Sequence, residues 1–280
     1  VSFPETLQPT SDLATALTGA QFVLVAVPSH GVRQVLRAGA DHVSPSAVVL
    51  SATKGLEDGT LARMSEVIAD EWANVREVAV LSGPSFAKEL AASLPTAVVV
   101  AASEEAAARH VQDEFRSGAL RLYASHDLVG VELGGALKNV IAIAAGVVEG
   151  LGLGHNALAA LITRGLAEIG RVAVAAGGQR DTLAGLAGMG DLVLTCTGQL
   201  SRNRHVGLEL ARGRRLDEIV AGMKMVAEGV RTTHAALALG ARLGVELPIA
   251  LQVDALLAGR VTPAVAVAEL MGRRQKAESD

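Results

Sequence analysis

The chain has 280 residues, 50% of them hydrophobic and 19% charged, which is enough for two domains with a large core. A formal net charge of -4 excludes the basic surface on which nucleic-acid binding depends. Cys196 is the only cysteine, which excludes an intrachain disulfide framework and is typical of the reducing cytoplasm. Apolar stretches such as 140–148 are shorter than the roughly 20 residues of a membrane span, so we expect no span.

Short apolar runs alternate with helix-period segments from Gln21 to Ser125. Strands are expected at 22–27, 47–52, 78–81, 97–101 and 120–123. Helices are expected between them at 30–39, 60–71, 85–92 and 104–115. Because the strand runs are continuously apolar rather than alternating, they are typical of a parallel sheet covered by helices on both faces.

The strand pattern ends at Asp127, and only helix-period segments follow. They lie at 129–150, 156–176, 203–212, 216–221, 230–243, 248–258 and 263–271. We therefore expect an α/β domain with a parallel sheet at 1–127, followed by an all-α domain at 128–280.

Polar residues and glycines follow three of the expected strands, at the edge where open α/β sheets bind ligands. Ser29 follows the first strand, although capping of the next helix is its more common role. Lys54 follows the second strand and can reach a phosphate or carbonyl oxygen, although a solvated lysine is the more common case. After the third strand, Gly83 lets the backbone approach a ligand, and Ser85 can cap the next helix and hold an anion.

The segment 132–139 places a lysine inside an otherwise apolar helix. Helical side chains lean toward the N-terminus, so Lys138 is expected to lie over Gly134 and Gly135. Two glycines inside a helix cost roughly 1 kcal/mol each relative to alanine, which is explained if a substrate fills an open slot above the ammonium. A lysine that snorkels beside a close helix crossing is an equally good interpretation.

Two further clusters lie downstream. Asp191 follows Gly-x-Gly and can orient a lysine or a hydroxyl, or it can simply cap a helix. The run Ser-Arg-Asn-Arg at 201–204 combines forked donors with a helix start, which suits a phosphate, although a solvated arginine-rich loop is the alternative. The histidines lack metal-ligand spacing and Gly-x-Ser-x-Gly is absent, so metal and serine hydrolase chemistry have no support. Cys196 is expected to be a packing residue.

Taken together, these motifs resemble those of bacterial NAD(P)-dependent glycerol-3-phosphate dehydrogenases. The matching segments recur in that family's order and spacing over essentially the whole chain: Val-Pro-Ser at 27–29, Ala-Thr-Lys-Gly-Leu at 52–56, Ser-Gly-Pro-Ser-Phe-Ala at 82–87, Leu-Gly-Gly-Ala-Leu-Lys-Asn-Val at 133–140, Ile-Thr-Arg-Gly at 162–165, Gly-Asp-Leu at 190–192 and Ser-Arg-Asn-Arg at 201–204. The resemblance implies hydride transfer between NAD(P)H and dihydroxyacetone phosphate, which gives sn-glycerol 3-phosphate for phospholipid synthesis.

The resemblance also implies residue roles. Lys138 would give and take the proton at the substrate oxygen, and a second cation, for which Lys54 is the candidate, would lower its pKa. The implied substrate-binding residues are Lys54, Gly83, Ser85, Lys138, Asp191, Ser201, Arg202 and Asn203, with the last three around the phosphate. The implied contacts to NAD or NADP are Lys54, Ala87, Arg202, Val226 and Glu228. The implied setting is the cytoplasm, with a small-molecule substrate, no nucleic acid, no membrane span and a homodimer left open.

Members of that family begin with a strand, a glycine-rich turn and a helix that hold the pyrophosphate, and no such pattern precedes Gln21. We therefore expect an N-terminally incomplete chain whose Rossmann-type sheet lacks its first β-α-β unit. Because that strand is central in the family, its absence is expected to leave two unpaired interior edges, poor folding and weak dinucleotide binding. Tight NADH binding would contradict this expectation. The choice between NAD and NADP is not readable from the remaining residues.

Two other functions stay open. A related two-domain dehydrogenase could act on a hydroxy acid or keto acid, since the 201–204 run suits a carboxylate too. Competition between dihydroxyacetone phosphate and keto acids in cofactor oxidation discriminates the two. An inactive scaffold that kept the helical domain is the other alternative, but the joint presence of Lys54, Lys138, Asp191 and Arg202 speaks against it.

Overall fold

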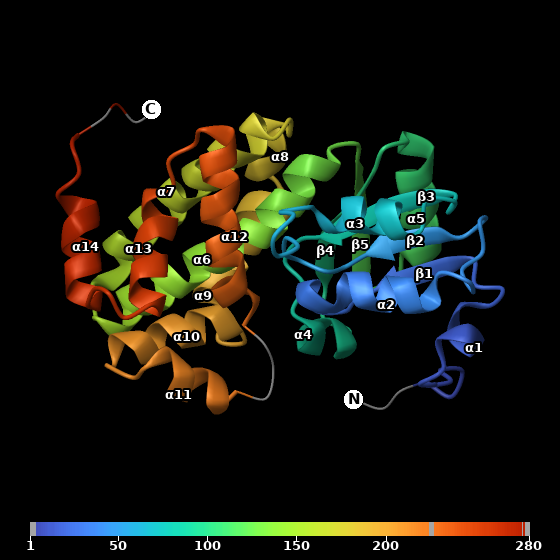
Figure 1. Ribbon diagram of the computed structural model, residues 1–280, viewed down its shortest axis with the longest axis horizontal. Helices are drawn as coiled ribbons and strands as arrows, with labels where there is room; N and C mark the ends of the chain where they lie inside the picture. Colours follow the sequence, from blue (N-terminus) through green and yellow to red (C-terminus); the bar gives the residue numbers. More distant parts are fainter. Residues whose placement is uncertain (1–3, 224–226, 276, 278–280) are drawn as a thin grey trace.

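The computed structural model describes residues 4–223, 227–275 and 277. Figure 1 shows two parts side by side, a sheet with helices over it and a larger group of helices. Hydrogen bonds join the five strands in sequence order: β1 (Phe22–Val25), β2 (Val48–Ser51), β3 (Glu77–Ser82), β4 (Thr96–Ala102) and β5 (Leu120–Ser125). The expected α/β sheet followed by helices is therefore confirmed.

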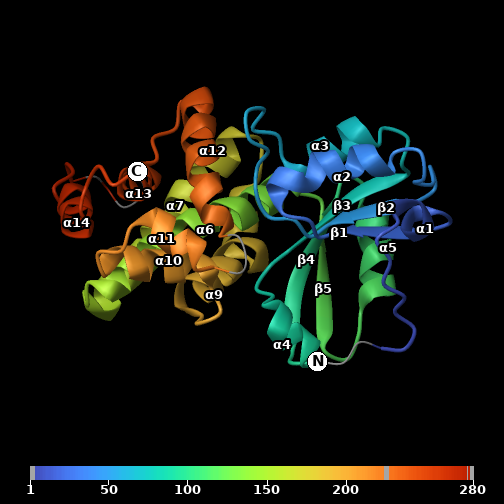
Figure 2. The same ribbon diagram turned by 60° about the horizontal axis from the view of Figure 1, so that its bottom comes forward.

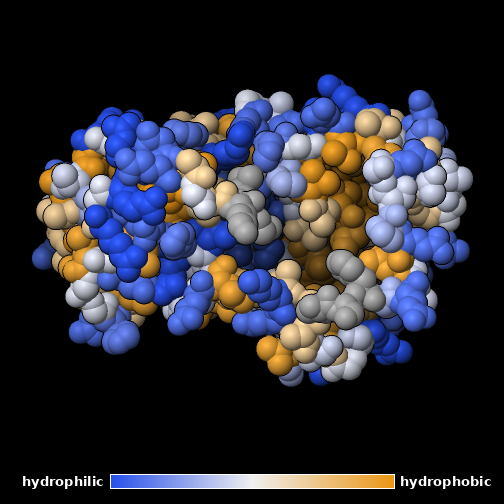
Figure 3. Space-filling view, turned by 90° about the horizontal axis from the view of Figure 1, so that it is seen from below, coloured by the Kyte–Doolittle hydropathy of each residue, from blue (hydrophilic) through white to orange (hydrophobic). Residues whose placement is uncertain are grey.

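The sheet is continuous, so the expectation of two unpaired interior edges is wrong. The strands that the chain supplies are neighbours in one sheet, and β1 and β5 form its two edges. At the β1 edge, Leu24 is 51% exposed. Seen from below, the half of the molecule that carries the sheet has a hollow with hydrophobic surface (Figure 3).

One pair of strands corrects the expectation of a wholly parallel sheet. The pairs β1–β2, β2–β3 and β4–β5 are parallel, whereas β3 and β4 are antiparallel. The link between β3 and β4 contains only α4 (Ala87–Ala91), a helix of 5 residues. Such a helix spans about 8 Å, less than the roughly 20 Å of a six-residue strand, so it cannot act as the crossover helix of a parallel pair. The antiparallel register shows that the chain enters β4 at the edge where β3 ends.

Helices cover both faces of the sheet (Figure 2). Val49 packs in the cluster under α2 (Val32–Gly39) and α3 (Met64–Glu71), which the short helix α1 (Leu13–Leu17) extends. Its neighbours Val48 and Leu50 pack instead under α5 (Glu105–Phe115), because successive strand residues point to opposite faces. With both faces covered, the carboxyl edge of β1 to β3 is left to face the helical part.

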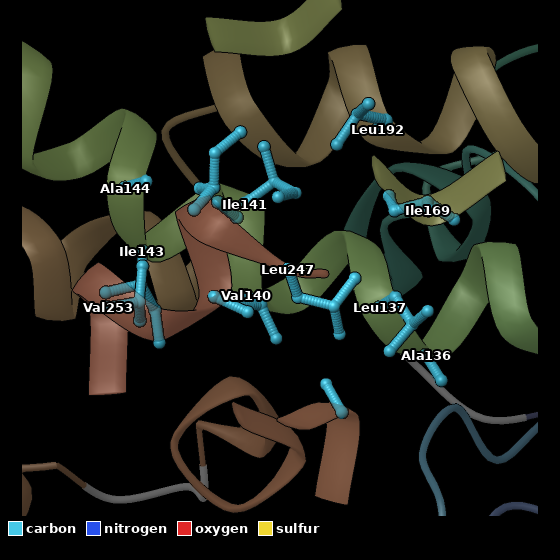
Figure 4. Close-up of a cluster of buried hydrophobic side chains, with 14 of the residues drawn as sticks. Ala136, Leu137, Val140, Ile141, Ile143, Ala144, Ile169, Leu192, Leu247 and Val253 are labelled. Atoms are coloured by element: carbon cyan, nitrogen blue, oxygen red, sulfur yellow. The ribbon is translucent and has the colours of Figure 1, made fainter. Parts of the chain in front are cut away.

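The helical part is built around α6 (Leu128–Gly150), which is buried from Gly130 to Val148. By length and composition α6 alone among the described helices is apolar enough to cross a membrane, but its most apolar window is 100% buried within the structure. The surrounding helices are α7 (Gly154–Ala175), α8 (Arg180–Ala184), the π-turn η2 (Leu186–Gly190), α9 (Asp191–Thr197), α10 (Arg202–Ala211), α11 (Leu216–Ala221), α12 (Glu228–Leu243), α13 (Pro248–Leu257) and α14 (Pro263–Met271). Figure 4 shows side chains of α6 meeting Ile169, Leu192 and Val253 from three of these helices.

Two glycines let α10 lie directly against α6. A Cβ atom on Gly146 of α6 would lie 1.9 Å from the carbonyl oxygen of Arg204, and one on Gly207 of α10 would lie 1.9 Å from that of Ile143. Real Cβ atoms do not approach an oxygen so closely. The start of α10 is therefore fixed relative to α6 by backbone contact.

This contact predicts the effect of one methyl group. Gly146→Ala should lower the free energy of unfolding by about 3 kcal/mol, because the neighbouring helix must move. Gly170→Ala is the matched control: Gly170 is also buried in a helix, but a Cβ there would meet nothing within 4 Å. It should be neutral or stabilise by up to about 1 kcal/mol. Urea unfolding measures both, and equal midpoints for the two variants would contradict the close crossing.

Candidate active site

Two lysines from separate segments meet at one buried carboxylate. Lys138 of α6 is 6% exposed, and its Nζ donates to Asp191 Oδ1 at 2.5 Å. Lys54, in the turn after β2, donates from its Nζ to Asp191 Oδ2 at 2.6 Å and to the carbonyl oxygen of Gly83 at 2.9 Å. Four site candidates that lie far apart in the sequence are thus brought together where the sheet meets the helices.

Asp191 serves the lysines and not a helix cap. It is the first residue of α9 and is 1% exposed, and its side chain makes no capping hydrogen bond. One turn later on the same face, the Thr195 hydroxyl donates to the backbone oxygen of Asp191 at 2.6 Å and accepts from Lys138 Nζ at 2.8 Å. One face of α9 therefore holds the Lys138 ammonium at two points.

The electrostatics of this cluster favour an amine that can lose its proton. Burial and the nearby charge of Lys54 lower the pKa of Lys138 from its ordinary 10.5 to about 8, although Asp191 opposes the change. For Asp191, burial acts to raise the pKa, but the two lysines outweigh burial and lower it. Asp191 therefore stays ionised while Lys138 changes charge near neutral pH.

Gly134 and Gly135 leave no open slot above Lys138, contrary to the expectation from the sequence. A Cβ atom on Gly134 would lie 2.7 Å from the carbonyl oxygen of Ala187 in η2, and one on Gly135 would lie 2.6 Å from Ser82 Oγ. The protein itself fills this space. The glycines instead let α6 approach η2 and the end of β3, which brings the ammonium close to α9. The structure supports the close crossing of the alternative interpretation, but Lys138 does not snorkel to solvent, because its Nζ is held by Asp191 and Thr195.

The phosphate candidates Ser201, Arg202 and Asn203 lie at the start of α10. Ser201 caps this helix with its hydroxyl, and Arg202 is exposed. The Asn203 amide nitrogen donates to Asn139 Oδ1 at 2.9 Å, and its oxygen accepts from the backbone N–H of Gly229 at 2.9 Å. Asn139 sits next to the central lysine on α6, so the phosphate candidates adjoin the lysine cluster.

The cofactor candidates lie around the carboxyl edge of the sheet. Glu228, which opens α12, accepts a hydrogen bond from Ser29 Oγ at 2.7 Å in the turn after β1. The turn after β2 is equally close, since a Cβ on Gly55 would lie 2.8 Å from Ser29 Oγ. Ala87 begins α4 after β3 and is exposed. Val226 lies outside the described residues.

Ser29 and Ser85 do not cap helices, which corrects that part of the expectation. The first bonds Glu228, and α2 shows no side-chain cap. Ser85 donates from its hydroxyl to the carbonyl oxygen of Gly83 at 3.2 Å, the same oxygen that Lys54 contacts. Ser85 is thereby placed at the margin of the lysine cluster.

Two polar residues of the cluster were not among the site residues selected from the sequence. Thr195 carries a signal that was available, because it lies one helical turn after Asp191 on the same face. Asn139 follows Lys138 directly, but its pairing with Asn203 joins α6 to α10 and needs the tertiary structure.

The described ranges 4–223, 227–275 and 277 contain no group of three or more His, Cys, Asp or Glu side chains that could hold a metal. Cys196 is 1% exposed in the helical core, and burial raises the pKa of its thiol to about 12. It is therefore a packing residue, as the sequence indicated.

Solved structures resemble this fold over almost all of its length. The crystal structure of glycerol-3-phosphate dehydrogenase from Coxiella burnetii matches with a TM-score of 0.92 and 41% identity, covering 97% of this chain and 83% of that one. A ketopantoate reductase from Ralstonia eutropha matches with a TM-score of 0.55 and 17% identity, over 92% of this chain and 80% of that one. This second likeness concerns the fold alone.

Sequence comparisons identify the family. Two relatives named glycerol-3-phosphate dehydrogenase (NAD(P)+), from Acidobacterium capsulatum and Koribacter versatilis, are 58% and 55% identical to this chain. The matches cover 94% and 99% of this chain and 80% and 83% of the relatives. The family model for the NAD-dependent glycerol-3-phosphate dehydrogenase N-terminus matches residues 1–108, and the one for the C-terminus matches 127–268. The chain belongs to the NAD-dependent glycerol-3-phosphate dehydrogenase family.

Proposed function

We propose that this chain interconverts dihydroxyacetone phosphate and sn-glycerol 3-phosphate with NAD(P)H, and that Lys138 gives and takes the proton at the substrate oxygen. The family is one of NAD(P)-dependent oxidoreductases, and the chain is an oxidoreductase of this kind. The observation that carries the role of Lys138 is its setting. Its ammonium is buried, has a pKa of about 8 and is held on Asp191 beside a second lysine.

The carboxyl edge of the sheet fits a dinucleotide in its chemistry. Lys54 and Ala87 follow β2 and β3 at this edge, where open α/β sheets bind ligands. Glu228 reaches the same edge through its hydrogen bond from Ser29. Lys54, Ala87, Arg202 and Glu228 are accordingly proposed to hold the cofactor. When bound, NAD(P)H supplies the hydride from its nicotinamide ring.

The proton-transfer step follows from the charges in the cluster. In the direction of reduction, the Lys138 ammonium donates its proton to the carbonyl oxygen that becomes the alcohol. In the direction of oxidation, the neutral Lys138 amine accepts that proton. Asp191 and Thr195 keep the amine in place, and Lys54 disfavours a second positive charge beside it.

The start of α10 supplies donors for the phosphate. Arg202 is exposed and offers a forked guanidinium. The Ser201 hydroxyl accepts a capping hydrogen bond, so its own proton remains to be donated. Asn203 has one amide N–H beyond the one given to Asn139. These three donors support a phosphate ester over a simple keto acid.

The domain division and the cellular compartment are further parts of the proposal. Residues 1–127 would form the cofactor domain and 128–280 the substrate domain. A single, buried cysteine suits the cytoplasm, where the product would feed glycerophospholipid synthesis.

The role of Lys138 predicts a paired result. Lys138→Arg and Lys138→Met should both lower kcat by about 100-fold or more, because arginine keeps the charge but cannot release its proton. Lys88→Arg, at an exposed lysine outside the cluster, is the control and should keep its activity. The measurement is kcat of each variant with dihydroxyacetone phosphate as substrate. Near-normal activity of the Lys138→Arg variant would remove this residue from the proton transfer.

The pKa of Lys138 predicts opposite pH dependences for the two directions. The neutral amine becomes the main form only above about pH 8. The rate of sn-glycerol 3-phosphate oxidation should therefore rise through pH 8 and then level off, whereas dihydroxyacetone phosphate reduction should fall above pH 8. Initial rates at saturating cofactor measure both profiles. Profiles that are flat between pH 7 and 9 in both directions would contradict the assignment of Lys138 to proton transfer.

The assignment of Arg202 to the phosphate predicts that Arg202→Ala distinguishes less well between phosphorylated and unphosphorylated substrates. Its kcat/KM for dihydroxyacetone phosphate should fall about 10- to 100-fold, the equivalent of one charge-assisted hydrogen bond of roughly 1.5–3 kcal/mol. At saturating cofactor, the kcat/KM for unphosphorylated dihydroxyacetone should fall much less, because only the proposed cofactor contact of Arg202 is then lost. Arg109→Ala, at an exposed arginine of α5, is the control. An equal loss with both substrates would assign Arg202 to something other than the phosphate.

A further inference from the structure

The segment 54–63, which joins β2 to α3, carries Lys54 at its start. It is a compact loop, because Leu56 and Arg63 near its two ends form an antiparallel bridge. Within it, the backbone N–H of Leu61 donates to the carbonyl oxygen of Glu57 at 3.0 Å. A displacement of one end of this segment is therefore transmitted to the other.

The segment packs against the helical part, although it joins a strand and a helix of the sheet-containing part. Leu56 is 4% exposed and is a member of the main helical cluster, and Leu61 packs against the same cluster. Leu61 has a φ of 62°, a backbone conformation that residues with a Cβ atom avoid. Such a conformation persists only where the surroundings impose it, so the contacts around the segment are what set its path.

The far end of the segment is tied to α6 by one buried carboxylate. Glu132 of α6 is 6% exposed. Its Oε2 accepts from Arg63 Nη1 at 2.6 Å and from Ser65 Oγ at 2.6 Å, and its Oε1 accepts from the backbone N–H of Ser65 at 2.8 Å. The helix that carries Lys138 therefore also holds the end of the segment that carries Lys54.

We propose that Glu132 is a positioning residue for Lys54. By fixing Arg63 and the start of α3 against α6, it holds the segment 54–63 so that the Lys54 ammonium stays on Asp191. Without it the segment moves away from α6, and the cation beside Lys138 is withdrawn. The inference rests on the proposed role of Lys138 in proton transfer.

Withdrawal of Lys54 has a measurable effect, because few other charges among the described residues face Lys138. Asp191 acts on it from α9 and favours the ammonium, whereas Lys54 acts from the β2–α3 segment and disfavours it. Cys196 of α9 stays neutral, since the pKa of its thiol is about 12. Glu228 of α12 is turned to Ser29. Losing Lys54 therefore moves the titration of Lys138 to higher pH.

The test is the pH profile of sn-glycerol 3-phosphate oxidation in the full chain. Lys54→Met should move the rising limb to higher pH by about 0.5–1 unit or more. Glu132→Gln and Arg63→Gln should move it in the same direction by less. The double variant Glu132→Gln/Arg63→Gln should shift the rising limb no further than the larger of the two single shifts, because both substitutions break the same contact.

Glu168→Gln is the matched control. Glu168 is 3% exposed and accepts from the backbone N–H groups of Ile249 and Ala250, both at 3.0 Å, at the start of α13. The substitution weakens the hydrogen bonds of a buried glutamate without changing any contact of the 54–63 segment. The melting temperature should fall, as in Glu132→Gln, while the limb stays in place.

Three results overturn the proposal. In the first, Lys54→Met shifts the rising limb of the pH profile, but Glu132→Gln and Arg63→Gln both keep the wild-type limb. Glu132 then does not position Lys54. An equal shift in Glu168→Gln shows a general loss of stability. A wild-type profile with no limb near pH 8 overturns the proton-transfer role itself, and with it this inference. If Glu132→Gln does not fold, the Arg63→Gln profile decides.

Discussion

The carboxylate of Asp191, shared between Lys54 and Lys138, is the interaction on which the site depends. A buried ion is tolerated only where partners replace its lost hydration, and here two ammonium groups do so. The cluster still carries one positive charge more than negative. Burial, together with the charge of Lys54, holds the pKa of Lys138 near 8, and the excess positive charge suits a phosphorylated substrate. Removing the carboxylate would leave two cations facing each other in a buried site.

The cluster exists because backbone approaches backbone around α6. Glycines 134 and 135 admit η2 and the end of β3, and glycines 146 and 207 let α6 and α10 touch. Each contact brings one part of the site to the same helix, namely the Asp191 segment, the Lys54 turn and the phosphate donors. The cost in helix propensity is thus explained by packing and not by an open space for substrate.

Local pattern predicted most elements well and a few poorly. The helices 216–221 and 263–271 were expected with the bounds that the structure shows, because Gly222 follows the first and Pro263 opens the second. The helices α8 and α9 and the π-turn η2 were not expected. They follow a glycine-rich stretch whose backbone is held by hydrogen bonds within the turn and by contact with α6, neither of which local periodicity reveals. The antiparallel β4 was missed because strand direction depends on the geometry of the link before it.

By itself the sequence determined the class of the fold, the separate groups at the strand ends and the identity of Lys138, Lys54 and Asp191 as chemical candidates. Those follow from residue type and local spacing, which need no knowledge of distant contacts. Only the tertiary structure decided that both lysines share one carboxylate, that Thr195 also contacts the Lys138 ammonium and that Glu132 ties the Lys54 segment to α6. Such contacts join residues far apart in the chain, so their geometry is set by how helices and strands pack and not by any local run of residues.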